Sequence, residues 1–386
     1  MSQLAQPLVW MSRFLRKGHA SQARQYGKGS PPDSGVSRRE LLTALAAAGA
    51  GLILPAGQLW SQTASPGGSG DPPNRIDVHH HIIPPPYLNR ERDRILAAAD
   101  PSLGPRILAW KPAQAIEEMD RNGIATAITS ISNPGIWMGN VQSARSLARA
   151  CNEYAAQMVR DYPGRFGIFA ALPLPDPDGS LREIEYALDV LKADGFGLMT
   201  SYEDRWPGDP AYAPVFEELN RRKAVVYFHP LAPACCRGLI PDVPEAVMEF
   251  LFDTTRAITS LLFSGTFARY RDIRFIFSHA GGAMPALAGR IEGYVRRHSE
   301  LAPHLPNGVL SELKRLHFDL AVSVNPATMA ALRNLVSIEQ MLFGSDFPYM
   351  DIPVTAGALD RFALSPAERQ AINHENAARL FPRLKA

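Results

Sequence analysis

Eight short apolar runs alternate with longer segments of helical periodicity from Arg75 to the end of the 386-residue chain. Short runs of this kind read as buried strands, and each is followed by a segment long enough for a crossover helix. Eight strand-then-helix units favour a closed parallel sheet, the (β/α)8 TIM barrel of the α/β class. The first run begins at Arg75 and breaks at Pro84; the others cover 125–132, 166–172, 195–202, 224–229, 274–279, 315–320 and 340–345.

The segments between these runs carry the apolar spacing of amphipathic helices. Several have basic side chains in their last turn, which the helix dipole favours. Residues 231–270 are longer than one crossover requires and begin with a Pro/Cys-rich loop, so we expect a specificity lid over the barrel mouth. Helices are predicted over 112–122, 142–161, 179–193, 213–222, 244–263, 284–301 and 326–335.

Length and composition are compatible with one barrel and an N-terminal extension, or with two domains. Hydrophobic residues make up 46% of the chain, enough for a large core. The net charge of +2 for the whole chain does not describe the predicted barrel, because the segment before Arg75 holds seven basic and three acidic residues. The remaining 33 basic and 35 acidic residues give a net charge of −2 and form no basic stripe, so nucleic acid is excluded as a partner.

The segment before Arg75 resembles an export signal. Arg38 and Arg39 directly precede an Ala/Leu/Gly run that is too short to span a bilayer, which is typical of the twin-arginine route. A helix capped at Ser37 is the alternative. The signal predicts a periplasmic protein without stable membrane anchoring, and without the signal the protein would be cytoplasmic. The predicted parts are a disordered basic region at 1–36, the signal at 37–64, a linker at 65–74 and the barrel at 75–386.

The first run ends in three consecutive histidines. Alternate side chains of a strand share a face, so His79 and His81 point one way while His80 points the other. A chance surface feature or a purification remnant is the alternative, but the triplet is internal and closed by prolines. The spacing therefore favours a two-histidine metal clamp.

Further ligand types stand where other runs end, which is where barrel enzymes place their catalytic groups. The fifth run ends in His229, the sixth in His279 and the eighth in Asp346. Three imidazoles and one carboxylate suit Zn²⁺ or another divalent transition metal such as Mn²⁺, with a position left for water. His279 is the imidazole left over, with a core histidine as the alternative interpretation.

These motifs resemble the amidohydrolase superfamily, in particular its branch around aminocarboxymuconate-semialdehyde, γ-resorcylate and methylsalicylate decarboxylases. The resemblance covers residues 75 to about 382. It is carried, in order, by Asp-x-His-x-His at 77–81, His-Pro at 229–230, His-x-Gly-Gly at 279–282 and Gly-Ser-Asp-Phe-Pro at 344–348.

The resemblance implies roles for individual residues. The metal ligands would be His79, His81, His229 and Asp346, and His279 would orient or activate the catalytic water or contact the substrate. His279 and Asp346 are also the candidate proton donors. The fourth run, at 195–202, lacks the lysine that bridges two metals in other branches of the superfamily, which implies one metal ion per subunit. The family also implies a homodimer in which a neighbouring arginine reaches the substrate carboxylate.

Other residues near the predicted mouth are weaker candidates. Phe347 would line a planar substrate in the family pattern, and Trp137 would stack on it or pack within its own loop. Cys235 and Cys236 follow His229 closely enough to enter the pocket, but the family gives them no role, and a packing role is favoured.

The function that this pattern predicts is metal-dependent, non-oxidative decarboxylation of a planar aromatic or muconate-like carboxylic acid. Hydrolysis of an ester, amide or lactone is the alternative, because it needs the same five residues. A non-catalytic metal-binding or substrate-binding barrel would be expected to lack a ligand, and none is missing.

Overall fold

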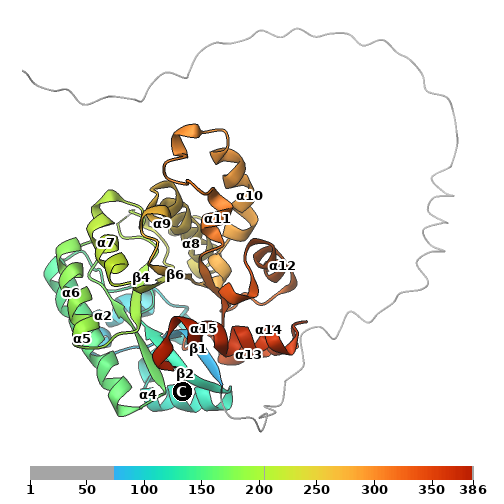
Figure 1. Cartoon of the computed structure of the whole chain (residues 1–386). Helices are drawn as coiled ribbons and strands as arrows, with labels where there is room; N and C mark the ends of the chain where they lie inside the picture. The colour runs from blue at the N-terminus through green and yellow to red at the C-terminus, as the bar shows by residue number, and fades with distance from the viewer. Residues whose placement is uncertain (1–73, 204, 385–386) are drawn as a thin grey trace, which may run out of the picture. The chain divides into compact units, whose positions relative to one another are not determined.

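The computed structural model describes residues 74–203 and 205–384, and the predicted segments before residue 74 lie outside this part. Within it, eight strands pair in parallel and in sequence order (Figure 1). All eight predicted strands are present, several of them shorter than expected. They are β1 (Arg75–His81), β2 (Ile124–Ser130), β3 (Phe166–Ala171), β4 (Gly195–Met199), β5 (Val225–His229), β6 (Arg274–Phe277), β7 (His317–Asp319) and β8 (Met341–Leu342).

The last strand returns to the first, as a barrel requires. The N–H group of Val78 donates a hydrogen bond to the carbonyl oxygen of Phe343 at 3.0 Å, and that of His81 donates to the carbonyl oxygen of Phe347 at 2.7 Å. These bonds connect β1 to the segment that follows β8. The predicted (β/α)8 topology is therefore confirmed for the described residues.

Helices follow the strands, and the seven predicted ones are present, although the predicted helix at 284–301 divides into α10 and a 3-10 turn at Ser299–Leu301. Seven others were not predicted: α2, whose opening prolines mark a strand end equally well, and the helices α3, α9, α11, α13, α14 and α15. The helices are α2 (Pro85–Ala97), α3 (Gly104–Ala109), α4 (Pro112–Arg121), α5 (Val141–Asp161), α6 (Pro177–Asp189), α7 (Ala213–Arg221), α8 (Glu245–Phe263), α9 (Thr266–Arg269), α10 (Met284–Val295), α11 (Val309–Leu313), α12 (Pro326–Leu335), α13 (Ile352–Arg361), α14 (Pro366–Gln370) and α15 (Asn376–Leu380).

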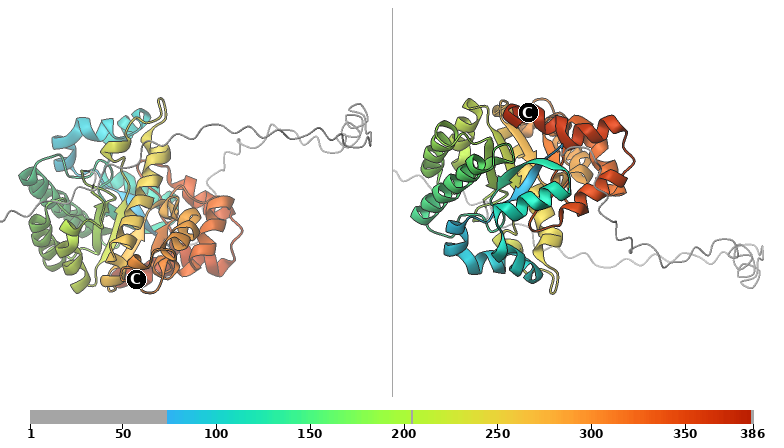
Figure 2. Two further views of the ribbon diagram at one scale, coloured as in Figure 1. Left: turned by 90° about the horizontal axis from the view of Figure 1, so that it is seen from above. Right: turned by 90° about the horizontal axis from the view of Figure 1, so that it is seen from below.

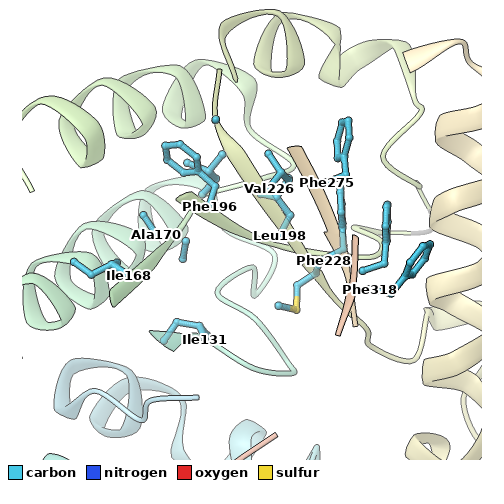
Figure 3. Close-up of a cluster of buried hydrophobic side chains, with 14 of the residues drawn as sticks. Ile131, Ile168, Ala170, Phe196, Leu198, Val226, Phe228, Phe275 and Phe318 are labelled. Carbon is cyan, nitrogen blue, oxygen red and sulfur yellow. The ribbon is translucent and has the colours of Figure 1, made fainter. Parts of the chain in front are cut away.

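Alternation along the strands builds two apolar layers. Outward-facing side chains such as Phe196, Val226 and Phe228 pack between the sheet and the helices (Figure 3). Inward-facing ones fill the barrel, where the rings of Phe169 and Tyr227 stack with centroids 5.1 Å apart. Phe381, just after α15, contacts Phe169 at 5.7 Å and belongs to the same inner cluster. The barrel is therefore filled at its N-terminal end, which leaves the C-terminal ends of the strands for a site.

The segment after β5 borders that end of the barrel. A loop with a 3-10 turn at Ala234–Cys236 leads into α8, and the ring of Phe250 in α8 lies 6.4 Å from that of His229. The loop projects from the body of the barrel, in yellow in Figure 2, and carries exposed Leu239 and Ile240. Whether it acts as the predicted lid remains a prediction. Among the described helices, none has the length and apolar character needed to cross a membrane.

Candidate metal centre

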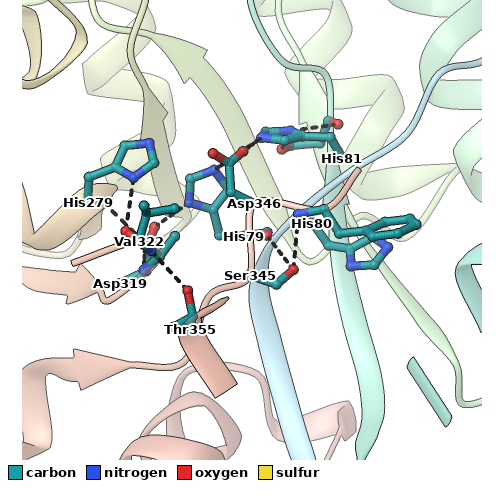
Figure 4. Close-up of polar contacts among 12 residues, drawn as sticks. His79, His80, His81, His279, Asp319, Val322, Ser345, Asp346 and Thr355 are labelled. Atoms are coloured by element: carbon teal, nitrogen blue, oxygen red, sulfur yellow. Dashed lines mark hydrogen bonds and ion pairs between the residues drawn. The ribbon is translucent and has the colours of Figure 1, made fainter. Parts of the chain in front are cut away.

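Four side chains from three strand ends converge at the mouth of the barrel. His79 and His81 come from β1, His229 ends β5, and Asp346 follows β8, and their ligand atoms lie within 4.8 Å of one another. The two Nε2 atoms of His79 and His81 are 3.1 Å apart, and each lies 3.2 Å from Oδ1 of Asp346 (Figure 4). The structure thus brings together the four residues that were predicted as ligands.

The spacing of these atoms fits a small divalent cation. Tetrahedral zinc sites have metal–nitrogen and metal–oxygen distances of about 2.0–2.2 Å, so their ligand atoms lie about 3.3 Å apart. The three measured separations are close to that value. His229 Nδ1 is buried and has no hydrogen-bond partner among the described residues. The donor set suits Zn²⁺, Mn²⁺ and similar ions, and does not discriminate between them.

The electrostatics of the site also favour a cation. Burial disfavours a charged His79, but the carboxylates of Asp319 and Asp346 outweigh burial and raise its pKa to about 10. Although burial alone would raise it, the charge of His79 holds the pKa of Asp346 well below its usual range. Burial and the neighbouring His81 lower the pKa of His229, which keeps that imidazole neutral. The buried Asp319 and the partly exposed Asp346 thus stabilise one positive charge at His79, beside imidazoles that stay neutral, and a bound cation would take the place of that charge.

Asp319, at the end of β7, adjoins the four candidate ligands and was not predicted from the sequence. Its Oδ2 lies 3.0 Å from Nδ1 of His79, and both side chains are fully buried. Its Oδ1 accepts hydrogen bonds from the N–H groups of His279 and Ala321. A carboxylate behind a ligating histidine fixes the ring and its tautomer. The rule that located the ligands, a polar residue ending a strand, would also have identified Asp319.

Asp77, the first residue of the Asp-x-His-x-His motif, holds β1 and the segment after β8 together. Its Oδ1 accepts hydrogen bonds from the N–H groups of His79 and Ser345, and Oδ2 accepts one from Ser345 Oγ at 2.5 Å. His80 Nδ1 lies 3.0 Å from the same Oδ2, and the His80 ring stacks on Phe347, so His80 is not one of the converging ligands. Asp77 and His80 would lie on opposite faces of a regular strand, and their contact accompanies a shift in the β1–β2 register between them.

Gly344 lets the side chains of His79 and Asp319 lie close to the backbone. A Cβ at this position would lie 2.7 Å from Cβ of His79 and 3.0 Å from Oδ1 of Asp319, closer than packed side chains allow. Asp346, two residues later, has a positive φ of 67°. The chain must therefore leave the sheet here, which explains why β8 ends at Leu342 rather than at Ser345.

His279 stands beside the four ligands. Its ring centroid lies 4.9 Å from that of His79, and its Nδ1 lies 3.1 Å from the carbonyl oxygen of Ala321. That contact places the proton on Nδ1 and leaves Nε2 as the reactive nitrogen. Gly282 follows with a positive φ of 64°, and a Cβ there would lie 2.1 Å from the Leu251 carbonyl oxygen of α8. Packing against α8, rather than space for a substrate, therefore requires this glycine.

The two predicted aromatic contacts differ in position. Phe347 is buried, and its ring stacks on that of His80 at 4.9 Å while the Arg106 guanidinium lies 4.9 Å from its centroid. Trp137 is half-buried in the loop after β2, where its Nε1 donates a hydrogen bond to Glu203. A substrate contact for either ring remains a prediction. Tyr349, which was not predicted, lies 5.5 Å from His81, centroid to centroid.

The chain matches the family model described as amidohydrolase over residues 76–383. It is 36% identical to decarboxylase yanB of Aspergillus niger over 330 residues, with 81% of this chain and 88% of the relative covered. It is 34% identical to the 6-methylsalicylic acid decarboxylase of Penicillium expansum, with 81% and 97% covered.

Solved structures of similar fold include amidohydrolases and decarboxylases. An amidohydrolase II structure is 27% identical, with a TM-score of 0.73 over 80% of this chain and 99% of that one. A dihydroxybenzoic acid decarboxylase of Polaromonas sp. JS666, solved with bound manganese, shares the fold at 22% identity, with a TM-score of 0.68 and 81% and 98% covered. On its sequence match and on the residues that meet at the barrel mouth, this chain belongs to the amidohydrolase family.

Proposed function

We propose that this protein is a metal-dependent decarboxylase that removes carbon dioxide, without oxidation, from a planar aromatic or muconate-like carboxylic acid. The observation that carries the proposal is the group His79, His81, His229 and Asp346 at the barrel mouth, with His279 beside it. Relatives at 34–36% identity over four-fifths of the chain are named as decarboxylases.

The reaction replaces a carboxylate on carbon by a proton, so the chain must bind the acid, exclude water and deliver one proton. A divalent cation held by the three histidines and Asp346 would act as a Lewis acid toward the substrate oxygens. The Nδ1–H group of His279 is held by the Ala321 carbonyl, which aims Nε2 at the site. His279 or Asp346 would deliver the proton to the carbon that loses carbon dioxide. Tyr227, packed under His79 at 5.5 Å, closes the site toward the barrel interior.

The test is product analysis with metal-replete protein. We expect carbon dioxide and the decarboxylated arene from 6-methylsalicylate or a related hydroxybenzoate, and no turnover by metal-free protein. Esters, amides and lactones serve as the comparison panel, because a hydrolase with the same site would release acid from them instead. Turnover of that panel alone would support the hydrolase, and binding of aromatic acids without any turnover would support a non-catalytic barrel.

We further propose one metal ion per subunit, Zn²⁺ or else Mn²⁺. The single-ion proposal is supported by the end of β4, where Thr200 and Ser201 donate hydrogen bonds to Asp253 and no lysine occurs. Elemental analysis of protein reconstituted with each ion, together with turnover, decides both points. A stoichiometry of two would contradict the proposal.

We also propose a homodimer, which is supported by the exposed apolar side chains Leu239, Ile240 and Val247 beside the barrel mouth. Sedimentation of the wild type and of a Leu239→Asp/Ile240→Asp variant tests it, and a monomeric wild type would refute it.

We also propose that the protein is exported by the twin-arginine route. This proposal rests on the paired residues Arg38 and Arg39. Changing both to lysine should retain the protein in the cytoplasm, and an unchanged distribution between cell fractions would contradict export by the twin-arginine route.

A further inference from the structure

We propose that Cys235 and Cys236 form a vicinal dithiol that hydrogen peroxide or another hydroperoxide oxidises reversibly to an intrachain disulfide. The two Sγ atoms lie 2.6 Å apart. A disulfide bond is about 2.05 Å long, so the two sulfur atoms are already much nearer to bonding distance than to ordinary van der Waals contact.

The local backbone creates this approach. Side chains of neighbouring residues point apart in a strand, whereas here both cysteines lie in the 3-10 turn Ala234–Cys236. The turn is held by a hydrogen bond from the Cys236 N–H group to the Pro233 carbonyl at 2.9 Å. Just beyond it, Arg237 Nε donates to the Ala232 carbonyl at 3.1 Å. The loop therefore presents the two thiols to each other before any oxidation.

Access differs between the two thiols in a way that suits a peroxide reaction. Cys235 is exposed, whereas Cys236 is buried. Cys235 as thiolate attacks the peroxide O–O bond, which forms a sulfenic acid at sulfur and releases one water once the leaving oxygen takes a proton. Cys236 then attacks that sulfur, forms the S–S bond and releases the sulfenic oxygen as a second water. Two thiols and one hydrogen peroxide thus give one disulfide and two waters, and another hydroperoxide would give its alcohol in place of the first water.

A disulfide between adjacent residues is easily reversed. Cα atoms joined by a trans peptide bond are about 3.8 Å apart, below the usual range of about 4.4–6.8 Å for disulfides. Such a bond is strained, and strained, accessible disulfides are the labile ones. Reduction by an external dithiol should therefore restore both thiols.

The position of the pair connects it to the metal centre. Cys235 lies six residues beyond the ligand His229, and between them the N–H group of Leu231 donates a hydrogen bond to Thr200 Oγ1 at the end of β4. The same segment continues into α8, whose Phe250 lies near His229. A closed ring would stiffen the loop at the mouth, so we expect a change in KM with metal content unchanged. This consequence rests on the proposed function, whereas the oxidation itself does not.

Mass spectrometry of the full chain tests the oxidation. After brief exposure to hydrogen peroxide, we expect the intact mass to fall by two hydrogen atoms and the number of reactive thiols in denatured protein to fall from three to one. A reducing dithiol should reverse both changes, and peptide mapping should place the bond between Cys235 and Cys236. Cys235→Ser and Cys236→Ser should each abolish the mass loss.

The matched control is Cys151→Ala. Cys151 lies buried in α5, and burial raises the pKa of its thiol to about 12, so the mass loss should persist in this variant. Stable oxygen addition at Cys235, or a disulfide between two chains, would overturn the proposal. Failure of the decarboxylase proposal would leave the mass and thiol readouts unaffected, because neither requires turnover.

Discussion

Replacing Asp319 by asparagine tests how the fold selects the tautomer of His79. For His79 Nε2 to bind a metal, its Nδ1 must carry the proton, and that N–H group donates a hydrogen bond to the Asp319 carboxylate at 3.0 Å. Oδ1 of Asp319 meanwhile accepts from the N–H groups of His279 and Ala321. An asparagine that keeps both backbone bonds through its carbonyl oxygen turns its NH₂ group toward Nδ1. His79 would then favour the Nε2–H tautomer, which cannot ligate through Nε2.

The expected loss is large because both partners are fully buried, so water cannot replace the carboxylate. A hydrogen bond to a charged group contributes about 1.5–3 kcal/mol. Outer partners of ligating histidines typically change metal affinity about 10–100-fold, or about 1.4–2.7 kcal/mol. We therefore expect the metal Kd of Asp319→Asn to rise about 10–100-fold, as measured by competition with a chelator of known affinity.

Asp194→Asn is the matched control. Asp194 is a nearly buried carboxylate that precedes β4 at the opposite end of the barrel, where it accepts a hydrogen bond from the Ile168 N–H group and pairs with Arg383. Its loss should lower the temperature of unfolding without changing the metal Kd. An unchanged Kd in Asp319→Asn, with reduced thermal stability alone, would show that Asp319 supports the fold rather than the tautomer.

Further substitutions are expected to separate packing, metal binding and proton chemistry. Gly344→Ala should cost about 1–3 kcal/mol through overpacking against His79 and reduce metal loading, whereas Gly289→Ala, with nothing within 4 Å, should leave metal loading unchanged; thermal unfolding and elemental analysis check both. His279→Ala should retain stoichiometric metal and lose turnover, and His79→Ala should lose the metal; metal retained in His79→Ala would show a wrong ligand assignment. Burial lowers the pKa of His317 from 6.5 to about 4. Between pH 4 and 6.5, therefore, His317 binds a proton in the unfolded chain but not in the folded one. Stability should fall by up to about 3 kcal/mol as pH drops from 6.5 to 4, and His317→Gln should remove that part of the urea-unfolding profile.

The sequence was sufficient to predict the strands and the convergence of the four candidate ligands, because both follow simple periodic rules. His79 and His81 share a face by alternation, and His229 and Asp346 follow apolar runs whose C-terminal ends meet in a barrel. Seven helices were not predicted; among them, α2 begins with prolines that suit a strand end and a helix start equally well. The contact between Asp319 and His79 joins residues 240 positions apart, so no local pattern indicates it. Position 344 requires glycine because Cβ of His79 lies against it, and that contact is also invisible in the local sequence.

The closure of the barrel between β1 and the segment after β8 has a consequence for synthesis. Asp77 and Ser345, which hold this seam, are 268 residues apart, and Asp346 adds its carboxylate only beyond the seam. A nascent chain on the ribosome carries His79 and His81 long before the partner segment emerges, so it presents two histidines without the aspartate. High-affinity metal capture should therefore begin only after release of the completed chain. Metal loading then reports that translation has passed Asp346, and chains truncated before residue 345 should remain free of metal however long they persist.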